Sequence, residues 1–387
     1  HMYGGVGVAK FAGAIAILCG TIIGVGIFSL PFVAYQAGII VLVAYLGWGA
    51  FVATVTALAY GELMYRTREN HRIPGYVALY LGRRWGRWAA LSTLCGLFGG
   101  QLVYLLVGGH FLHQLLGFGR WPESFTVLAY AGLGALIIAG TNRRLARSEL
   151  LMLPFFLVSM AFIIAQVLPH VNPGLLDDVH WQRLLLPYGV AIFSIWGLTA
   201  VAECREFLGN AHARLLKPAI LTSFPFCAAA YAAFATVVAA ATGGGTSPDA
   251  LGGLTLLIGP GITRWFYLFG VLTTFTSYIS FGITIRNVFV YDLRKSRGPS
   301  WWFAVTVPVA LYVSGINNFL MMMGIIGTVS LGFETVSILL AYLQAQHLRP
   351  TGRVPYQLKL SRRTIYVLVG VITAGSLSAL FSLLRHA

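Results

Sequence analysis

The stretch GTIIGVGIFSLP, residues 20–31, interrupts the first long apolar segment of the chain, residues 10–38. It contains Gly20, Gly24 and Gly26, and a glycine inside a helix costs about 1 kcal/mol relative to alanine. The segment is otherwise long and apolar enough to span a membrane, so we expect a spanning helix that breaks near its middle. Open backbone at membrane depth is tolerated only where it lines a cavity or is buried in protein. The break therefore predicts an internal site.

A broken spanning helix offers two kinds of binding group. The N–H groups at the start of its second half carry the positive end of a helix dipole and can bind a carboxylate. The carbonyls freed on the other side of the break can coordinate a cation. Gly20 and Gly24 also form a small-xxx-small pair, which is typical of close helix association. On this stretch alone, a binding site and a packing motif are both open.

The composition of the whole chain places this helix in a membrane protein. Hydrophobic residues make up 58% of the 387 residues and charged residues only 10%, whereas soluble domains carry about 25% charged residues. We expect an all-α polytopic membrane protein whose surroundings are the lipid bilayer. Eleven apolar segments are candidate transmembrane helices, the ninth of them short: residues 10–38, 41–65, 88–116, 124–140, 149–169, 185–206, 217–241, 262–291, 300–315, 317–344 and 364–384.

The net charge of +15 is distributed as a topology signal. With a cytoplasmic N-terminus, 21 of the 26 Lys and Arg residues fall in segments on the cytoplasmic side and four outside, as the positive-inside rule requires. The remaining one, Arg286, lies within the eighth span. We therefore expect a multi-pass protein of the plasma membrane, or of the inner membrane in a prokaryote. A nucleic-acid partner is excluded, because the basic residues do not gather on a soluble face.

The sixth span repeats the pattern of the first. Residues 193–199 bring Ser194, Gly197 and Thr199 near its centre, after Pro187 and Gly189. Glycine-interrupted helices at corresponding positions of two five-helix halves are the best sequence pointer to a transporter site. The candidate substrate-binding residues on the two spans are Thr21, Ile23, Gly24, Val25, Gly26, Phe193, Ser194, Trp196 and Gly197.

These stretches resemble the amino acid/auxin permease family, within the amino acid–polyamine–organocation superfamily. Residues 20–31, 73–76, 187–197, 277–278 with 291–293, and 318–332 carry the resemblance. The sequence is similar to bacterial aromatic amino acid permeases and animal neutral amino acid transporters. The resemblance implies a leucine-transporter-type 5+5 inverted repeat with broken helices 1 and 6. It divides one transporter domain, 1–387, into repeats at 10–169 and 185–344 and an extra helix at 364–384.

The resemblance also implies roles for polar residues in spans three and eight. Span three lines the substrate pocket in this fold, so Gln101 or Tyr104 is expected to contact the substrate carboxylate or side chain, with packing in the helix core as the open alternative. The sodium position in the fold uses span-one carbonyls and span-eight hydroxyls, which here are Gly20 and Ile23 with Thr276 and Ser277. Hydroxyls in membrane helices also bond their own preceding carbonyls, so this assignment stays open. Span five has no lysine, which some proton-coupled relatives have, and sodium is therefore favoured over a proton.

Ionisable residues inside spans are functional hypotheses by default. Glu62 and Arg286 lie at similar depth and are expected to form a structural pair or a gate. Glu334 lies deeper, in span ten, and is the best candidate for a protonatable coupling residue. We expect no cofactor, because the four cysteines lack the spacing of a metal site.

The function predicted from these features is ion-coupled, alternating-access transport of a neutral amino acid, apolar or aromatic. One alternative is a polyamine or organic-cation exchanger of the same fold, which would need acidic residues in the centres of spans one, three and six. Another is an amino acid sensor that does not transport. An intramembrane enzyme is not expected, because the one adjacent acidic pair, Asp177 and Asp178, lies in an external loop.

Overall fold

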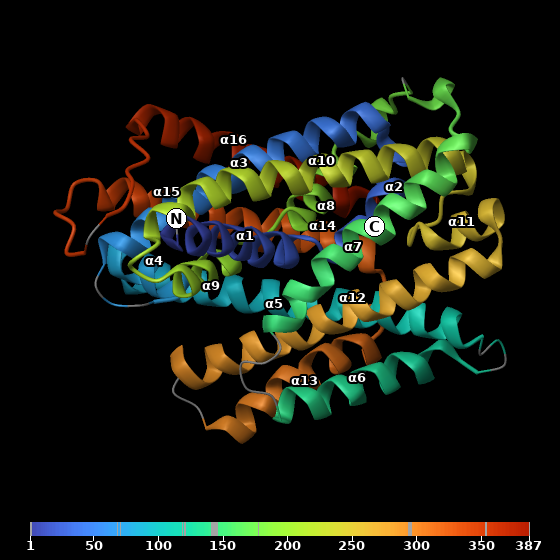
Figure 1. The fold of residues 1–387 in the computed structure, drawn as a ribbon, viewed down its shortest axis with the longest axis horizontal. Coiled ribbons are helices and arrows are strands. Elements are labelled where there is room, and N and C mark those ends of the chain that lie inside the picture. Colours follow the sequence, from blue (N-terminus) through green and yellow to red (C-terminus); the bar gives the residue numbers. More distant parts are fainter. Residues whose placement is uncertain are drawn as a thin grey trace.

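The computed structural model describes residues 2–67, 69, 71–117, 119, 121–140, 146–176, 178–292, 296–352 and 354–386. Across these ranges the chain is helical and forms no strand, so the all-α prediction is confirmed (Figure 1). Several residues used above for the topology and for the acidic pair lie outside the described residues: Arg68, Arg120, Arg143, Arg144, Asp177, Arg294, Lys295 and Arg353.

Each of the eleven predicted spans coincides with a helix or with two consecutive helices. In chain order these are α1 (Met2–Ile22) with α2 (Gly26–Ala37), α3 (Ile39–Arg66), α5 (Arg83–Leu116), α6 (Glu123–Gly140), α7 (Ala146–Val167), α8 (Leu186–Ser194) with α9 (Leu198–Leu208), α10 (Leu216–Thr242), α12 (Pro260–Asn287), α13 (Arg297–Val313), α14 (Phe319–Ile325) with α15 (Gly332–Ala345), and α16 (Arg362–His386).

Within the described ranges, nine helical segments are long and apolar enough to cross a membrane, and the bent pair α1–α2 makes a tenth. The remaining predicted span, α13, has 17 residues. It is the short ninth segment of the sequence.

Shorter elements connect the spans. Two are helices, α4 (Ile73–Leu81) and α11 (Leu251–Ile258), and five are single 3₁₀ turns. The 3₁₀ turns are η1 (Leu168–His170), η2 (Pro173–Leu175), η3 (Trp181–Arg183), η4 (Ala213–Leu215) and η5 (Gly243–Gly245). Two π-helical turns, η6 (Val288–Asp292) and η7 (Ile326–Leu331), lie within spans eight and ten.

The expected interruptions of spans one and six are both present. Helix α1 ends at Ile22 and α2 begins at Gly26, with a bend of 57° between them. Helix α8 ends at Ser194 and α9 begins at Leu198. A third irregularity, the π turn η7 in span ten, was not predicted. Such turns inside helices are frequent at functional sites.

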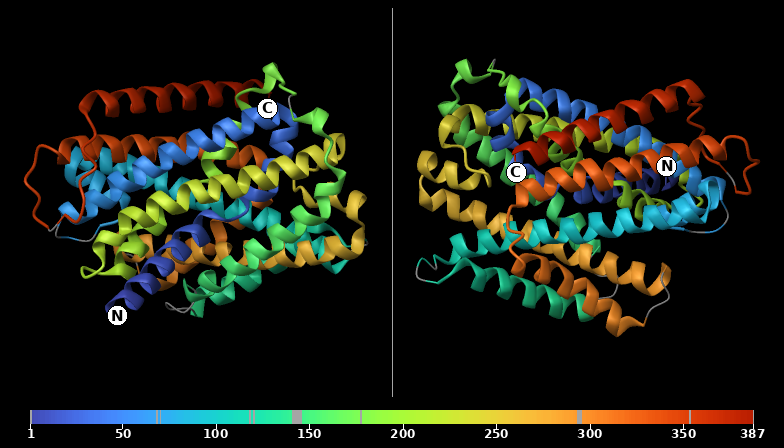
Figure 2. Two further views of the ribbon diagram at one scale, coloured as in Figure 1. Left: turned by 45° about the horizontal axis from the view of Figure 1, so that its top comes forward. Right: turned by 180° about the vertical axis from the view of Figure 1, so that it is seen from behind.

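The spans pack in two groups, which Figure 1 shows toward opposite edges of the molecule. One group comprises α5, α6, α12 and α13, and the other comprises α1, α2, α3, α8, α9 and α10. Span ten contacts both, since α14 and η7 pack against α5 and α8. Among the nine described segments that are long and apolar enough to cross a membrane, span ten has the largest buried share of its apolar window, 72%, against 22% for α16, which lies along one side of the molecule (Figure 2). A carboxyl on span ten is therefore held in the interior.

The glycine-rich stretch 242–253 is ordered by its own polar groups. It forms η5 and the start of α11. The Ser247 hydroxyl accepts a hydrogen bond from Gly253 N at 2.9 Å, and the Asp249 carboxylate accepts from Gly252 N at 3.3 Å. These bonds cap N–H groups that the first turn of a helix cannot pair internally.

Candidate functional site

The interruptions of spans one and six lie directly against each other. A Cβ atom on Gly26 would come within 2.6 Å of the Ser194 Cβ and 2.9 Å of its Cα, and a Cβ on Gly197 within 2.5 Å of the Ile22 Cγ1. Only glycine fits at these two contacts. Two segments about 170 residues apart in sequence are thus joined at their irregular backbone.

Tyr231 of α10 stabilises the break in span one. Its hydroxyl accepts a hydrogen bond from Gly24 N at 3.1 Å and donates one to Ile22 O at 2.8 Å. One buried phenol therefore satisfies two backbone groups that an intact helix would have paired internally. The sequence reasoning missed this residue, although a tyrosine inside the alanine-rich run 228–241 was a usable signal.

The donors left at the first break are fewer than the sequence suggested. The N–H of Gly24 is committed to Tyr231, and the N–H of Ile23 bonds Cys19 O at 2.8 Å. The N–H of Val25 has no acceptor among the described residues, and the N–H of Gly26 belongs to the unpaired first turn of α2. The N–H donors available to a carboxylate are therefore those of Val25 and Gly26.

The second break presents carbonyls. The Trp196 N–H bonds Phe193 O at 3.2 Å, and the Ser194 hydroxyl donates to Val190 O at 2.7 Å. A carbonyl oxygen has two lone pairs, so Phe193 O keeps acceptor capacity. The C-terminal end of α8 is also the negative end of its dipole, which favours a cationic group such as an ammonium.

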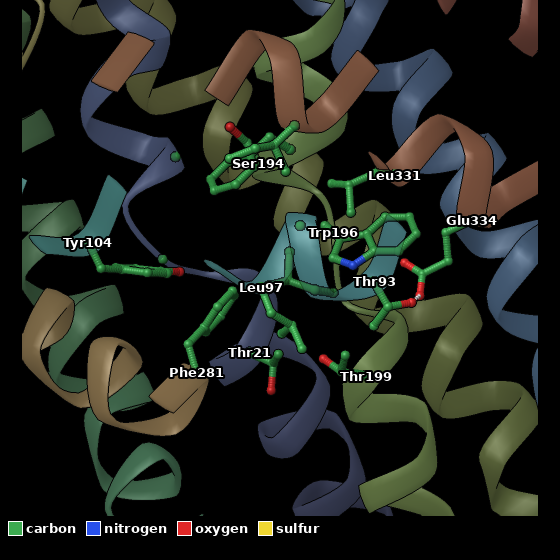
Figure 3. A pocket seen from close by; sticks show the side chains of 16 residues that line it. Thr21, Thr93, Leu97, Tyr104, Ser194, Trp196, Thr199, Phe281, Leu331 and Glu334 are labelled. Atoms are coloured by element: carbon green, nitrogen blue, oxygen red, sulfur yellow. Dashed lines mark hydrogen bonds between the residues drawn. The ribbon is translucent and has the colours of Figure 1, made fainter. Parts of the chain in front are cut away.

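A small cavity lies between the two breaks and the neighbouring helices (Figure 3). The cavity has a volume of about 50 Å³, which is enough for only a few water molecules. To admit an amino acid, the side chains that line the cavity would have to shift. The lining residues are Thr21, Ile22, Gly24, Gly26, Thr93, Gly96, Leu97, Tyr104, Phe193, Ser194, Trp196, Thr199, Phe281, Ile326, Leu331 and Glu334.

The cavity contains many of the residues singled out from the sequence and adds others. Of the substrate candidates it includes Thr21, Gly24, Gly26, Tyr104, Phe193, Ser194 and Trp196, but not Ile23, Val25, Gln101 or Gly197. Sequence reasoning missed Thr93, Leu97, Phe281, Ile326 and Leu331 as lining residues. They are small, apolar or aromatic residues, and neither the regular helices of Thr93, Leu97 and Phe281 nor the π turn η7 of Ile326 and Leu331 has a composition that marks a site.

Tyr104 and Gln101 of α5 occupy different surroundings. The Tyr104 hydroxyl lies against Gly24, and its ring is 5.2 Å from that of Phe281. Gln101 is fully buried, and its amide lies toward Gly282 of α12. Neither amide atom of Gln101 has a hydrogen-bond partner in the part of the chain that the structure describes. Tyr104 is thus the residue of this pair that lines the cavity.

Glu334 supplies the carboxyl of the cavity. It is 3% exposed, and its Oε1 accepts a hydrogen bond from the Thr93 hydroxyl at 3.1 Å. Figure 3 shows Glu334 and Thr93 on the side opposite Tyr104, with Leu97 and Trp196 between them. The cavity therefore has two distinct polar regions, one at the helix breaks and one at Glu334.

The four candidate sodium ligands do not meet in this cavity. Neither Thr276 nor Ser277 lines it, and α12 contributes Phe281 instead. The Thr276 hydroxyl donates to Thr273 O at 3.0 Å, and Thr273, Thr274 and Thr284 bond carbonyls one turn earlier. These bonds match the local alternative noted for the span-eight hydroxyls. The site formed by Gly20, Ile23, Thr276 and Ser277 stays a prediction.

The expected pair of Glu62 with Arg286 was wrong. Glu62 instead bonds Arg66, one turn later on α3, at 2.8 Å, and accepts from the Tyr342 hydroxyl at 3.1 Å and from Leu358 N at 2.7 Å. Arg286 donates to Ile138 O of α6 at 2.5 Å. The reason is that α3 and α12 belong to different helix groups, so similar depth does not imply contact. Glu62 holds the segment between α15 and α16 against α3.

A second cavity lies near α11 and the end of α5. This cavity has a volume of about 400 Å³, and the residues that line it include His110, Glu123 and Asp249. The imidazole of His110 is 3.0 Å from Glu123 and 3.5 Å from Asp249. Burial raises the pKa of Asp249, but hydrogen bonds to His110 and Ser247 outweigh it and hold the pKa below its usual value.

Comparison with known proteins supports these assignments of fold and family. The sequence profile of the tryptophan/tyrosine permease family matches residues 8–378. A tryptophan-specific transport protein of Pseudomonas aeruginosa (strain UCBPP-PA14) is 27% identical over 203 residues, which are 48% of this chain and 47% of that protein. The chain thus matches about half the length of this curated relative.

The crystal structure of MhsT in complex with L-phenylalanine shares the fold. Its TM-score is 0.65 at 16% sequence identity, over 96% of this chain and 98% of that chain. This likeness concerns the fold alone and confirms the leucine-transporter-type architecture with broken spans one and six. Because the family profile covers nearly the whole chain, the resemblance to amino acid permeases is also confirmed. The chain belongs to the tryptophan/tyrosine permease family.

Proposed function

We propose that the protein is a secondary active transporter of neutral aromatic amino acids, and not an enzyme. The observation that carries this proposal is the meeting of two broken helices at a cavity with aromatic walls. Its family, the tryptophan-specific relative and the L-phenylalanine named with MhsT support an aromatic substrate.

The backbone at the breaks binds the two groups that all amino acids share. The N–H groups of Val25 and Gly26 hold the carboxylate, where the α2 dipole favours negative charge. The carbonyls of Phe193 and Ser194 hold the ammonium at the opposite dipole end. Trp196 contributes to the wall along the side chain, and Tyr104 and Phe281 line the side of the cavity away from Glu334. Because these side chains nearly fill the cavity, substrate binding opens it by moving them.

The division into two helix groups supports a mechanism of alternating access. Spans one and six belong to the group with α3 and α10, and they move as a unit against α5, α6, α12 and α13. The inner halves of spans one and six are already tied together, because Lys10 donates to Phe207 O at 2.7 Å. Substrate bound at both breaks joins the two spans at a second level, so occupancy is coupled to closure.

The coupling ion is sodium or, alternatively, a proton. Sodium would use Gly20, Ile23, Thr276 and Ser277, and Glu334 is the candidate for a proton. The test is uptake into proteoliposomes with sodium replaced by choline at fixed pH, and then across a pH gradient without sodium. Loss of uptake in choline, together with a weakened sodium dependence in Ser277→Ala, supports sodium; uptake driven by the pH gradient alone contradicts it.

The N-terminus is cytoplasmic, the location is the plasma or inner membrane, and the single domain consists of repeats 10–169 and 185–344 plus the helix at 364–384. Figure 1 shows α4, α9 and the connection from α15 to α16 at one end of the molecule and α11 at the other. Single cysteines introduced at Arg72 and Ser247 test this, since only the second should react with an impermeant thiol reagent from outside.

Two alternatives have distinct outcomes in the same assays. A polyamine or organic-cation exchanger would bind a diamine in preference to tryptophan, although the cavity offers only one carboxyl group, Glu334, among its lining residues. A sensor would bind amino acids without flux. Absence of binding across all twenty amino acids would refute the amino acid assignment itself.

A further inference from the structure

We propose that Glu334 determines substrate specificity by accepting a hydrogen bond from the N–H or O–H group on the ring of an aromatic substrate. The proposal rests on the proposed function and adds to it a residue that selects tryptophan or tyrosine over phenylalanine. It follows from the place of Glu334 in the cavity and from the acceptor capacity that the protein leaves unused there.

Glu334 is a buried carboxyl with little internal compensation. The one hydrogen bond to it from the described residues comes from the Thr93 hydroxyl, and no Lys, Arg or His nitrogen in that part of the chain lies within 4.0 Å. A carboxylate offers about four lone-pair sites, and burying it without partners is costly. An acceptor is thus available at the cavity wall.

The position of Glu334 decides which part of the substrate it meets. The carboxylate and ammonium of an amino acid are attached to one carbon atom, and both are bound at the breaks, near Gly26 and Ser194. Figure 3 shows Glu334 on the opposite side of the cavity from Tyr104, which contacts Gly24. A substrate anchored at the breaks therefore directs the far end of its side chain toward Glu334.

The walls beside Glu334 favour a ring with a polar edge. Leu97, Trp196 and Leu331 present apolar surface on the way to the carboxyl, while Thr93 already uses its donor on Oε1 and fixes the orientation of the group. Indole and phenol combine an apolar face with one donor. Phenylalanine fills the same space but leaves the carboxyl without a new partner, and an unpaired buried acceptor is what makes such a site selective.

The experiment compares two ligands of nearly the same shape. 3-Benzothienyl-L-alanine replaces the indole N–H of tryptophan by sulfur, which cannot donate. Equilibrium binding to the purified full-length protein in detergent, without ion gradients, gives the ratio of the two dissociation constants. A hydrogen bond to the carboxyl, in its neutral or its ionised form, predicts that wild type prefers tryptophan by about 2- to 150-fold.

Variants assign this preference to Glu334. Glu334→Met keeps the length of the side chain and removes the acceptor, so the ratio should fall to about 1 while benzothienylalanine still binds. Thr335→Val is the matched control, because Thr335 is equally buried next in the chain and its hydroxyl bonds Leu331 O; its ratio should equal that of wild type.

An unchanged ratio in Glu334→Met overturns the proposal and would leave Glu334 as a coupling or structural carboxyl. If that variant does not fold, Glu334→Leu takes its place, since it also removes the acceptor; its ratio should fall to about 1, and an unchanged ratio again refutes the proposal. Wild type that binds no amino acid at all refutes the proposed function instead, which separates the two failures.

Discussion

The hydroxyl of Tyr231 is predicted to stabilise the break in span one, and removing it tests how the irregular backbone is held. Tyr231→Phe deletes the acceptor of Gly24 N–H and the donor to Ile22 O. Each such bond contributes about 0.5–1.5 kcal/mol net, and side-chain bonds within membranes average about 0.6 kcal/mol. Two bonds give an expected loss of about 1–3 kcal/mol in the free energy of unfolding.

The assay is unfolding of the purified protein, by SDS titration and by heat, beside a matched control. Tyr278→Phe removes the same atom from an equally buried tyrosine, whose hydroxyl has no partner in the described part of the chain. We expect this control to unfold like wild type or slightly later. Equal unfolding free energies for Tyr231→Phe and Tyr278→Phe would refute the stabilising role.

A second readout separates a role at the site from general stability. In Tyr231→Phe the N–H of Gly24 becomes free, and a substrate carboxylate bound at Val25 and Gly26 can accept from it. Saturating tryptophan should therefore restore part of the lost stability, beyond its effect on wild type. The same gain from tryptophan in both proteins would contradict the placement of the carboxylate.

Three further predictions concern other parts of the structure. Gly26→Ala places a methyl group within 2.9 Å of the Ser194 Cα at the second break and should abolish substrate binding and uptake. The control Gly47→Ala, whose added methyl group has no atom within 4 Å, should retain both. Substrate binding by Gly26→Ala would contradict the close contact. Glu62→Ala removes the acceptor of Arg66, Tyr342 and a backbone N–H and should cost about 3 kcal/mol of unfolding free energy in SDS titration; an unchanged value would show that the contact contributes nothing. The lowered pKa of Asp249 means that the ionised side chain stabilises the fold above about pH 4 and that this contribution is lost as the pH falls further. The difference in Tm between wild type and Asp249→Asn should therefore shrink from pH 6 to pH 3. A difference that does not depend on pH would contradict this role of the Asp249 carboxylate.

Local features of the sequence predicted the helices well. The positions of all eleven spans follow from apolar length, because each spanning helix must satisfy its backbone within itself. The break at Gly24 and Gly26 was predictable from local sequence, because glycine weakens a helix and three glycines lie close together at positions 20, 24 and 26. The second break needed the comparison with span one, because Gly197 alone is a weak signal.

Contacts between helices were much harder to predict. Glu62 and Arg286 have similar depth but lie on helices of different groups, so the inferred pair was wrong. The partnership of Glu334 with Thr93 joins residues 241 positions apart, and no periodicity relates them. The π turn η7 beside Glu334 also has no composition that distinguishes it from its helix.

The sequence by itself determined that this protein lies in a membrane, where its helices run and which of them break. These properties depend on transfer of side chains and backbone from water to lipid, which acts on each segment separately. The tertiary structure alone decided that the two breaks face each other at Gly26 and Ser194, that Tyr231 fills the gap left in the first, and that Glu334 closes the far side of the cavity. Those arrangements depend on the rotation and packing of helices distant in sequence, and small changes in either would bring other side chains together.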